Sequence, residues 1–142
     1  MSPAPTEVPT AARLRLVVTR LVKVMRRDAD AGLSPSLLSA LATLEDHGAL
    51  RISALAAAES VDPSVATRLV AALEERRYVE RRDDPDDRRA CVVALSAKGR
   101  KTLERLWVER AATLAARLEK LDARDVRAIE AALPALERLL DA

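Results

Sequence analysis

Two sets of residues in this sequence have the types and spacing needed to bind a nucleic acid. The first is Asp87-Arg88-Arg89, at the end of an acidic run that begins at Asp83. An arginine suits the negative potential of a narrow minor groove, and a carboxylate two residues away can fix its rotamer. The second set shares one face of a helix: Ser64, Thr67, Arg68 and Ala71. Small and polar side chains like these fit base edges and phosphates in a major groove, although such a face also fits plain exposure to solvent.

The sequence on either side of the arginines predicts a β-hairpin. From Tyr78 to Arg81 apolar and charged residues alternate, and from Ala90 to Leu95 the chain is rich in valine; both patterns favour strands. Between them, Asp84-Pro85 favours a turn, because proline presets φ and an aspartate carboxylate can accept a backbone hydrogen bond. We therefore expect a hairpin over about residues 78–95, with both arginines at its tip.

The polar face lies on the second helix of a predicted helix-turn-helix. Ser53 is a plausible N-cap for a short helix that ends near Glu59. A short turn leads to Asp62, which can cap a longer helix that opens with Pro63 and ends near Arg76. A short helix, a tight turn and a capped longer helix together predict a helix-turn-helix over about residues 53–76.

Apolar residues recur at helical spacing in four further segments. These segments are residues 11–27, 35–47, 97–121 and 124–140. Ser34 and Ser96 can cap the second and third of them, and Gly48 can end the second. Pro134 should kink or restart the last, because it removes a hydrogen-bond donor. The outer helices carry more apolar residues than a small DNA-reading unit needs, so a dimer interface is predicted.

Composition narrows the class of protein. A chain of 142 residues most simply forms one domain, and its 24 basic and 22 acidic residues leave a net charge of only +2. The apolar runs are too short to span a membrane, and Met1 to Val8 lacks the features of a secretory signal. Cys91 is the only cysteine and cannot form an internal disulfide. These features predict a cytoplasmic protein.

Catalysis has little support in this sequence. There is one histidine, one cysteine, no glycine-rich phosphate loop and no cluster of metal ligands, so we expect neither an enzyme nor a cofactor or metal site. His47 is expected to interact with the dipole at the end of its helix. Cys91 is expected to be a buried, inert thiol within the hairpin and not a redox switch.

The order of these elements and several motifs resemble the MarR family of transcriptional regulators. Asp87-Arg88-Arg89, followed by Leu95-Ser96 and then Gly99, resembles the wing signature of that family. Upstream, the segments 52–56 and 64–74 resemble its helix-turn-helix. The resemblance runs from about residue 11 to the C-terminus and is most specific from 62 to 99.

Residues 1–10 hold three prolines and no periodic pattern, which predicts a flexible tail. For residues 11–142 the resemblance implies a single domain with a mainly α fold and a small β-hairpin wing. It implies a homodimer whose interlocking helices lie at about 11–30 and 97–142. The winged helix-turn-helix of residues 34–96 would then read double-stranded DNA at a pseudo-palindromic operator.

The resemblance also implies roles for single residues. The expected DNA-binding residues are Ser53, Ser64, Thr67, Arg68, Asp87, Arg88 and Arg89. Arg89 would enter the minor groove with Asp87 orienting it, while Arg88 would face a phosphate, or the two arginines would exchange roles. The family often has glycine after the recognition helix, where this chain has Arg77. Either the helix cap differs here, or Arg77 accepts a positive φ at a cost of ~1 kcal/mol.

The leading hypothesis is therefore a sequence-specific regulator, most simply a repressor of nearby genes. The alternative is a winged-helix module that binds a protein, which the near balance of charges around the hairpin favours. By resemblance, a small anionic or aromatic effector would bind between the dimer helices and the DNA-reading lobe. Trp107 would border that pocket, although a core position also suits its indole ring.

Overall fold

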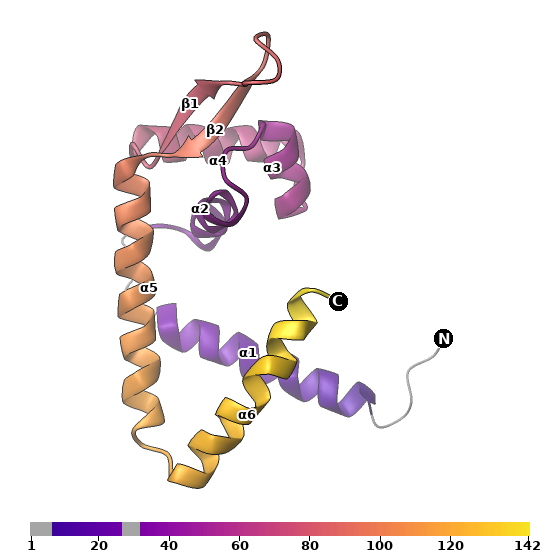
Figure 1. Ribbon diagram of the computed structural model, residues 1–142, viewed down its shortest axis with the longest axis vertical. Coiled ribbons are helices and arrows are strands. Elements are labelled where there is room, and N and C mark those ends of the chain that lie inside the picture. The colour runs from indigo at the N-terminus through magenta and orange to yellow at the C-terminus, as the bar shows by residue number, and fades with distance from the viewer. Residues whose placement is uncertain (1–6, 27–31) are drawn as a thin grey trace. The chain divides into compact units, whose positions relative to one another are not determined.

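The computed structural model describes residues 7–26 and 32–142, and within them the chain forms six helices and one hairpin (Figure 1). In chain order these are α1 (Glu7–Arg26), α2 (Pro35–His47), α3 (Ile52–Glu59), α4 (Pro63–Glu75), β1 (Val79–Asp83), β2 (Cys91–Leu95), α5 (Ala97–Leu118) and α6 (Ala123–Leu140). The expected mainly α fold with a small hairpin is confirmed. The expected tail at residues 1–6 and the end of the first helical region, residues 27–30, lie outside the described residues.

The chain divides into two compact units. One contains the described residues from 32 to 108, and the other contains residues 7–26 and 109–142. The first unit, called the winged unit below, holds α2, α3, α4, the hairpin and the first half of α5.

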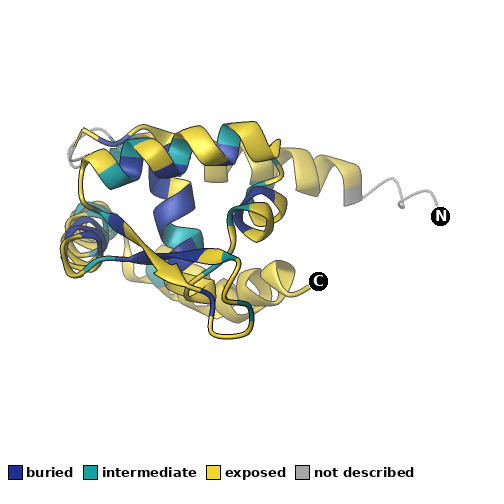
Figure 2. Ribbon diagram, turned by 90° about the horizontal axis from the view of Figure 1, so that it is seen from above, coloured by how far each residue is buried: buried dark blue, intermediate teal, exposed yellow. Residues whose placement is uncertain are grey.

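Leucine and valine fill the core of the winged unit. α2 contributes Leu37, Leu38, Leu41 and Leu44, whose helical spacing in the sequence predicts a buried face. The largest fully buried side chains are Leu41, Leu44, Leu55, Leu73, Leu103, Leu106, Val70 and Val93. Each such side chain contributes roughly 1.5–3 kcal/mol by leaving water. In Figure 2 the buried colour follows the inner sides of α2, α4 and the hairpin strands.

The ends of α2 lie where capping residues predict them. The Ser34 hydroxyl accepts a hydrogen bond from the Leu37 N–H at 3.3 Å, and Pro35 occupies the first turn. Gly48 ends the helix with a φ of 77°, and its N–H donates to the carbonyl of Leu44 at 3.0 Å. Each of these features was predicted from the residue types.

The start of α3 differs from the prediction. Ser53 was expected to cap this helix, but the cap is Arg51, and Ser53 lies exposed in the first turn. The cause is a bridge between Leu50 and Val93, whose N–H and carbonyl groups pair in both directions at 3.0 and 2.7 Å. The sequence predicts a short extended link at Ala49-Leu50-Arg51, and this bridge confirms it. Because it holds the chain extended up to Arg51, the helix begins directly afterwards.

The hairpin is antiparallel, with Val79 opposite Leu95 and Asp83 opposite Cys91. Its strand ends near α5 pack on the core, where Val79 and Val93 are buried. The loop lies at the opposite end of the hairpin and projects beyond the helices (Figure 1). The predicted hairpin and its tip are therefore confirmed.

A residue with a left-handed backbone conformation joins α4 to the hairpin. Arg77 has a φ of 60°, so it is the non-glycine residue with positive φ that was expected as one of two solutions. The Tyr78 N–H donates to the Leu73 carbonyl at 3.0 Å and the Arg77 N–H to the Glu74 carbonyl at 2.9 Å. These two bonds form the Schellman ending of a helix, which normally favours glycine at this position.

Ser96 starts α5 as predicted. Its hydroxyl accepts a hydrogen bond from the Gly99 N–H at 3.0 Å and donates to the Arg77 carbonyl at 2.5 Å. The Ser96 N–H donates to the Tyr78 carbonyl at 3.0 Å. One serine therefore joins the start of α5 to the residues that follow α4.

The unit formed by the two chain ends contains α1 and α6. α1 begins at Glu7, so residues 7–10, which were expected in the tail, are helical. Pro9 falls in the first turn, where a backbone N–H has no partner within the helix anyway. α6 continues through Pro134, which was expected to kink or restart it. Nearly all of α6 is exposed (Figure 2).

Candidate DNA-binding surface

The outer face of α4 is exposed and polar. Ser64, Thr67, Arg68 and Ala71 are all exposed, as predicted. The Thr67 hydroxyl donates to the Pro63 carbonyl at 2.9 Å, which leaves its methyl group and oxygen lone pair on the surface. The buried residues on the opposite side are Ala66, Val70 and Leu73. The sequence predicts one apolar face of Val65, Leu69, Ala72 and Leu73; of these Leu73 is buried and the other three are half-buried.

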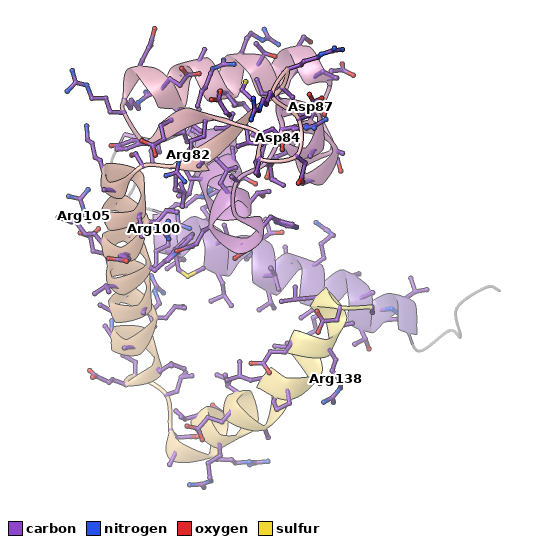
Figure 3. The ribbon with its side chains drawn as sticks, turned by 45° about the horizontal axis from the view of Figure 1, so that its top comes forward. Arg82, Asp84, Asp87, Arg100, Arg105 and Arg138 are labelled. Atoms are coloured by element: carbon purple, nitrogen blue, oxygen red, sulfur yellow. The ribbon has the colours of Figure 1, made fainter. Side chains whose placement is uncertain are left out.

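The hairpin loop is held by two of its own carboxylates. The Asp84 carboxylate accepts the Asp86 N–H at 2.9 Å, and the Asp87 carboxylate accepts the Arg89 N–H at 2.9 Å. The backbone N–H of Asp84 donates to the Ala90 carbonyl at 3.1 Å. Figure 3 shows Asp84 and Asp87 close together in this loop. The acidic residues are therefore part of the loop's own structure.

Arg88 and Arg89 are exposed at the hairpin tip. Asp87 was expected to orient Arg89, and it does contact this residue, through the backbone N–H. Among the described residues, no ion pair joins the Asp87 carboxylate to the Arg89 guanidinium. Asp87 therefore orients the backbone that carries the arginine.

A residue outside the hairpin completes the loop. The Arg51 Nε donates to Asp84 Oδ2 at 2.6 Å, and Arg51 Nη2 lies 4.0 Å from Asp87 Oδ2. The Asp84 side chain is only 8% exposed. The hydrogen bond from the Asp86 N–H and the ion pair with Arg51 hold the pKa of Asp84 below its usual value.

Sequence reasoning did not find Arg51. The residue is separated from Asp84 by 33 positions, and neither belongs to a motif that pairs them. The bridge between Leu50 and Val93 brings them together, because it places the start of α3 beside the hairpin. A signal for it was present only in the predicted extended link around residue 50.

A second ion pair ties the hairpin to α4. The Arg81 Nε on β1 donates to Glu74 Oε1 on α4 at 2.8 Å, and this hydrogen bond raises the pKa of Arg81. Both side chains are about one-third exposed or more, so the pair contributes at most about 1 kcal/mol. Its main effect is geometric, since it links the two elements that carry the candidate DNA-binding residues.

The structure corrects the expectation for Cys91. This thiol was predicted to be buried, but it is exposed. Cys91 lies on the same face of β2 as Val93. It is nearer the loop, however, where the hairpin extends beyond the core. The Arg81 Nη1 lies 3.9 Å from its sulfur.

Trp107 lies half-buried on α5 and packs against the core. Its indole N–H donates to the Glu45 carboxylate on α2 at 2.9 Å. Nearer the start of α5, a hollow of about 490 Å³ is lined by Ala97, Lys98, Lys101, Thr102 and Arg105. The three basic residues around this hollow, Lys98, Lys101 and Arg105, therefore precede Trp107 on α5.

The described part of the chain holds neither a metal-binding cluster nor a membrane-spanning helix. Within residues 7–26 and 32–142, no group of three or more His, Cys, Asp and Glu residues is arranged to hold a metal ion. None of the described helices is long and apolar enough to cross a membrane.

Comparison with known proteins finds a family model and several relatives that are similar to this chain in sequence. Residues 33–91, which contain α2, α3, α4 and β1, match the sequence model of the MarR family. An HTH-type transcriptional regulator of Mycobacterium leprae is 37% identical over 119 residues, covering 82% of this chain and 83% of that protein. The HTH-type transcriptional repressor MdtR of Bacillus subtilis is 32% identical over 84 residues, covering 59% of this chain and 54% of that protein.

A solved structure extends the similarity to both units of the chain. A transcriptional regulator from Pseudomonas aeruginosa has a TM-score of 0.85 and 31% sequence identity, with 99% of each chain covered.

Proposed function

The chain belongs to the MarR family of transcriptional regulators, and we propose that it regulates transcription by binding double-stranded DNA as a homodimer. The observation that carries the proposal is the joint position of two exposed surfaces. The polar face of α4 and the arginines of the hairpin tip lie on one compact unit, tied together by the ion pair between Arg81 and Glu74. The family consists of regulators and not of enzymes.

The recognition helix is proposed to lie in the major groove. Ser64, Thr67 and Arg68 are exposed on its first two turns, where a recognition helix contacts base edges. Ser53 is exposed at the start of α3 and is proposed to contact a phosphate. Asp62 forms the start of α4 through its carbonyl, which accepts the Ala66 N–H at 3.1 Å.

The hairpin is proposed to serve as the wing. Arg88 and Arg89 are exposed at the end that projects beyond the helices. One of them would enter the minor groove and the other would face a phosphate. Asp87 supports this arrangement by holding the Arg89 backbone. Two such units should meet half-sites about one helical turn apart, ~10 base pairs, on a pseudo-palindromic operator.

Apolar faces in the unit of the chain ends support a homodimer. Large apolar side chains are exposed on both terminal helices, and monomeric proteins rarely leave so many of them facing water. They are Leu16, Val17, Val18 and Leu21 on α1, and Ile129, Leu133, Leu136, Leu139 and Leu140 on α6. A second copy of the chain is the partner proposed to cover them.

The sign of regulation and an effector complete the proposal. Repression is the favoured sign, since MdtR is a repressor and an operator-bound dimer can block a promoter.

A small anionic effector is favoured by the three basic residues around the hollow on α5, with Trp107 beyond them on the same helix. Such a ligand regulates only if it prefers one conformation of the dimer. We also propose that the protein is cytoplasmic, because it would bind DNA there.

Selection of bound sites from random double-stranded DNA tests this function. We expect an enriched palindrome whose half-sites are about one helical turn apart, bound by a dimer. The affinity for it should fall steeply as salt rises, because phosphate contacts release counterions. A protein-binding module would enrich no sequence, and that result would overturn the proposal. Sedimentation of the free protein tests the dimer independently.

A further inference from the structure

The hairpin tip carries an excess of acidic residues that DNA binding leaves unexplained. Between Asp83 and Arg89 there are four aspartates and two arginines. Carboxylates next to a phosphate backbone would repel it. A wing that approaches DNA therefore needs its carboxylates neutralised or turned away from the DNA.

Asp84 is fully engaged within the protein. One carboxylate oxygen accepts the Asp86 N–H at 2.9 Å, and the other accepts the Arg51 Nε at 2.6 Å. Its backbone N–H donates to the Ala90 carbonyl and its carbonyl accepts the Asp87 N–H, at 3.1 and 3.3 Å. With a side chain only 8% exposed, Asp84 is the point on which the loop is fixed.

Arg51 connects this point to the helix-turn-helix. It is the N-cap residue of α3, and its carbonyl accepts the Leu55 N–H at 2.9 Å. The backbone of Arg51 is therefore part of the first helix of the motif, while its side chain binds the loop. A single residue therefore links the start of α3 to the hairpin loop.

We infer that Arg51 is a positioning residue of the wing: its ion pair with Asp84 fixes the hairpin loop to the start of α3 and keeps this carboxylate away from phosphate. Asp87, 4.0 Å from Arg51 Nη2, is drawn to the same side. Arg51 thus holds two of the four aspartates, while Asp83 and Asp86 stay exposed beside Arg88 and Arg89. This inference rests on the proposed DNA-binding function for its consequence, but its geometry can be measured without DNA.

A competing role for Arg51 is a direct phosphate contact. Its side chain is 46% exposed, and it lies beside the first helix of the motif. The two roles predict opposite effects for Asp84→Asn. If Arg51 contacts phosphate, loss of the neighbouring carboxylate leaves that arginine freer and binding is unchanged or tighter. If Arg51 positions the wing, the same substitution weakens binding.

The first measurement is hydrogen exchange of the backbone amides in residues 84–91 without DNA. Arg51→Gln and Asp84→Asn should each speed exchange in the loop by about tenfold, because opening of the loop becomes easier. Arg82→Gln and Glu80→Gln are matched controls, since this ion pair on β1 measures 2.5 Å but is exposed on both sides, 56% and 50%. Exchange that stays at the wild-type rate in both Arg51→Gln and Asp84→Asn would overturn the inference.

The second measurement is affinity for the selected operator across a salt series. Arg51→Gln and Asp84→Asn should each weaken binding by about tenfold, and the double variant should bind no worse than either single variant. The slope of affinity against salt should stay at its wild-type value in Arg51→Gln. A slope lowered by about one, or tighter binding by Asp84→Asn, would assign Arg51 to a phosphate instead. If the wild-type protein binds no DNA, the proposed function fails, while the exchange experiment still decides whether Arg51 holds the loop.

Discussion

Gly99 on α5 lies directly against the backbone of Tyr78, so closely that an added Cβ would be 2.0 Å from the Tyr78 carbonyl oxygen. The same carbonyl accepts the Ser96 N–H at 3.0 Å. This contact joins the long helix to the junction between the recognition helix and the hairpin. Glycine is required because backbone atoms on both sides leave no flexible side chain to move aside.

Gly99→Ala should therefore lower the free energy of unfolding by about 1–3 kcal/mol, the usual cost of overpacking. Urea denaturation measures it. Gly48→Ala is the matched control, since its Cβ would meet none of the described atoms within 4 Å and it would suffer only from a φ of 77°. A cost for Gly99→Ala no larger than that of Gly48→Ala would contradict the close approach.

Arg77→Gly should stabilise the protein by about 0.5–1 kcal/mol. The left-handed backbone at Arg77 costs an L-residue roughly 1–2 kcal/mol, which exceeds the entropy that glycine loses on folding. Thermal denaturation checks the sign. Arg76→Gly, one residue earlier with a φ of −82°, should destabilise instead. Equal effects at both positions would contradict the strain at Arg77.

Arg89→Ala should weaken operator binding by about tenfold or more without changing the dimer, because the proposed wing would lose a charge that faces either the minor groove or a phosphate. Fluorescence anisotropy with the selected operator measures the loss, and sedimentation checks the dimer. Arg88→Ala tells the two arginines apart, since loss of a phosphate contact lowers affinity for all sequences alike. Arg124→Ala, exposed at the start of α6, is the control and should bind normally. Normal binding by Arg89→Ala would contradict its role in the wing.

Acid should release the ion pair of Asp84. Its folded-state pKa lies below the ordinary 3.8, because the Asp86 N–H and Arg51 favour the charged form. The resulting stability is present above pH 3.8 and is lost as the pH falls through the lowered pKa. Asp84→Asn should therefore cost stability at pH 6 and cost less at pH 3, as measured by urea denaturation. A cost that is the same at both pH values would contradict the pKa shift.

Local residue types predicted the parts of the fold that depend on a few neighbouring residues. Ser34, Pro35 and Gly48 fixed both ends of α2, and the valine-rich segment with its Asp-Pro turn predicted the hairpin. For Arg77, the family resemblance left two alternatives, and the structure shows the one with a positive φ. Each of these features involves residues close together in the chain.

Features that depend on distant segments were not predicted. Ser53 was expected to cap α3, but the bridge of Leu50 to Val93 moved the start of that helix. The same bridge created the ion pair of Arg51, which no local pattern indicated. Cys91 was expected to be buried because it belongs to an apolar strand, yet the strand extends past the core before it reaches the loop.

The bridge between Leu50 and Val93 has a consequence for the borders of the small sheet. β2 pairs with β1 on one side and is covered by Leu50 on the other, so β1 provides the open edge. Residues 80–83 of this edge are Glu-Arg-Arg-Asp, four charged side chains in a row. Charges along an open edge disfavour pairing with another strand. In the proposed dimer on DNA, this charged edge would keep the two hairpins from joining strand to strand.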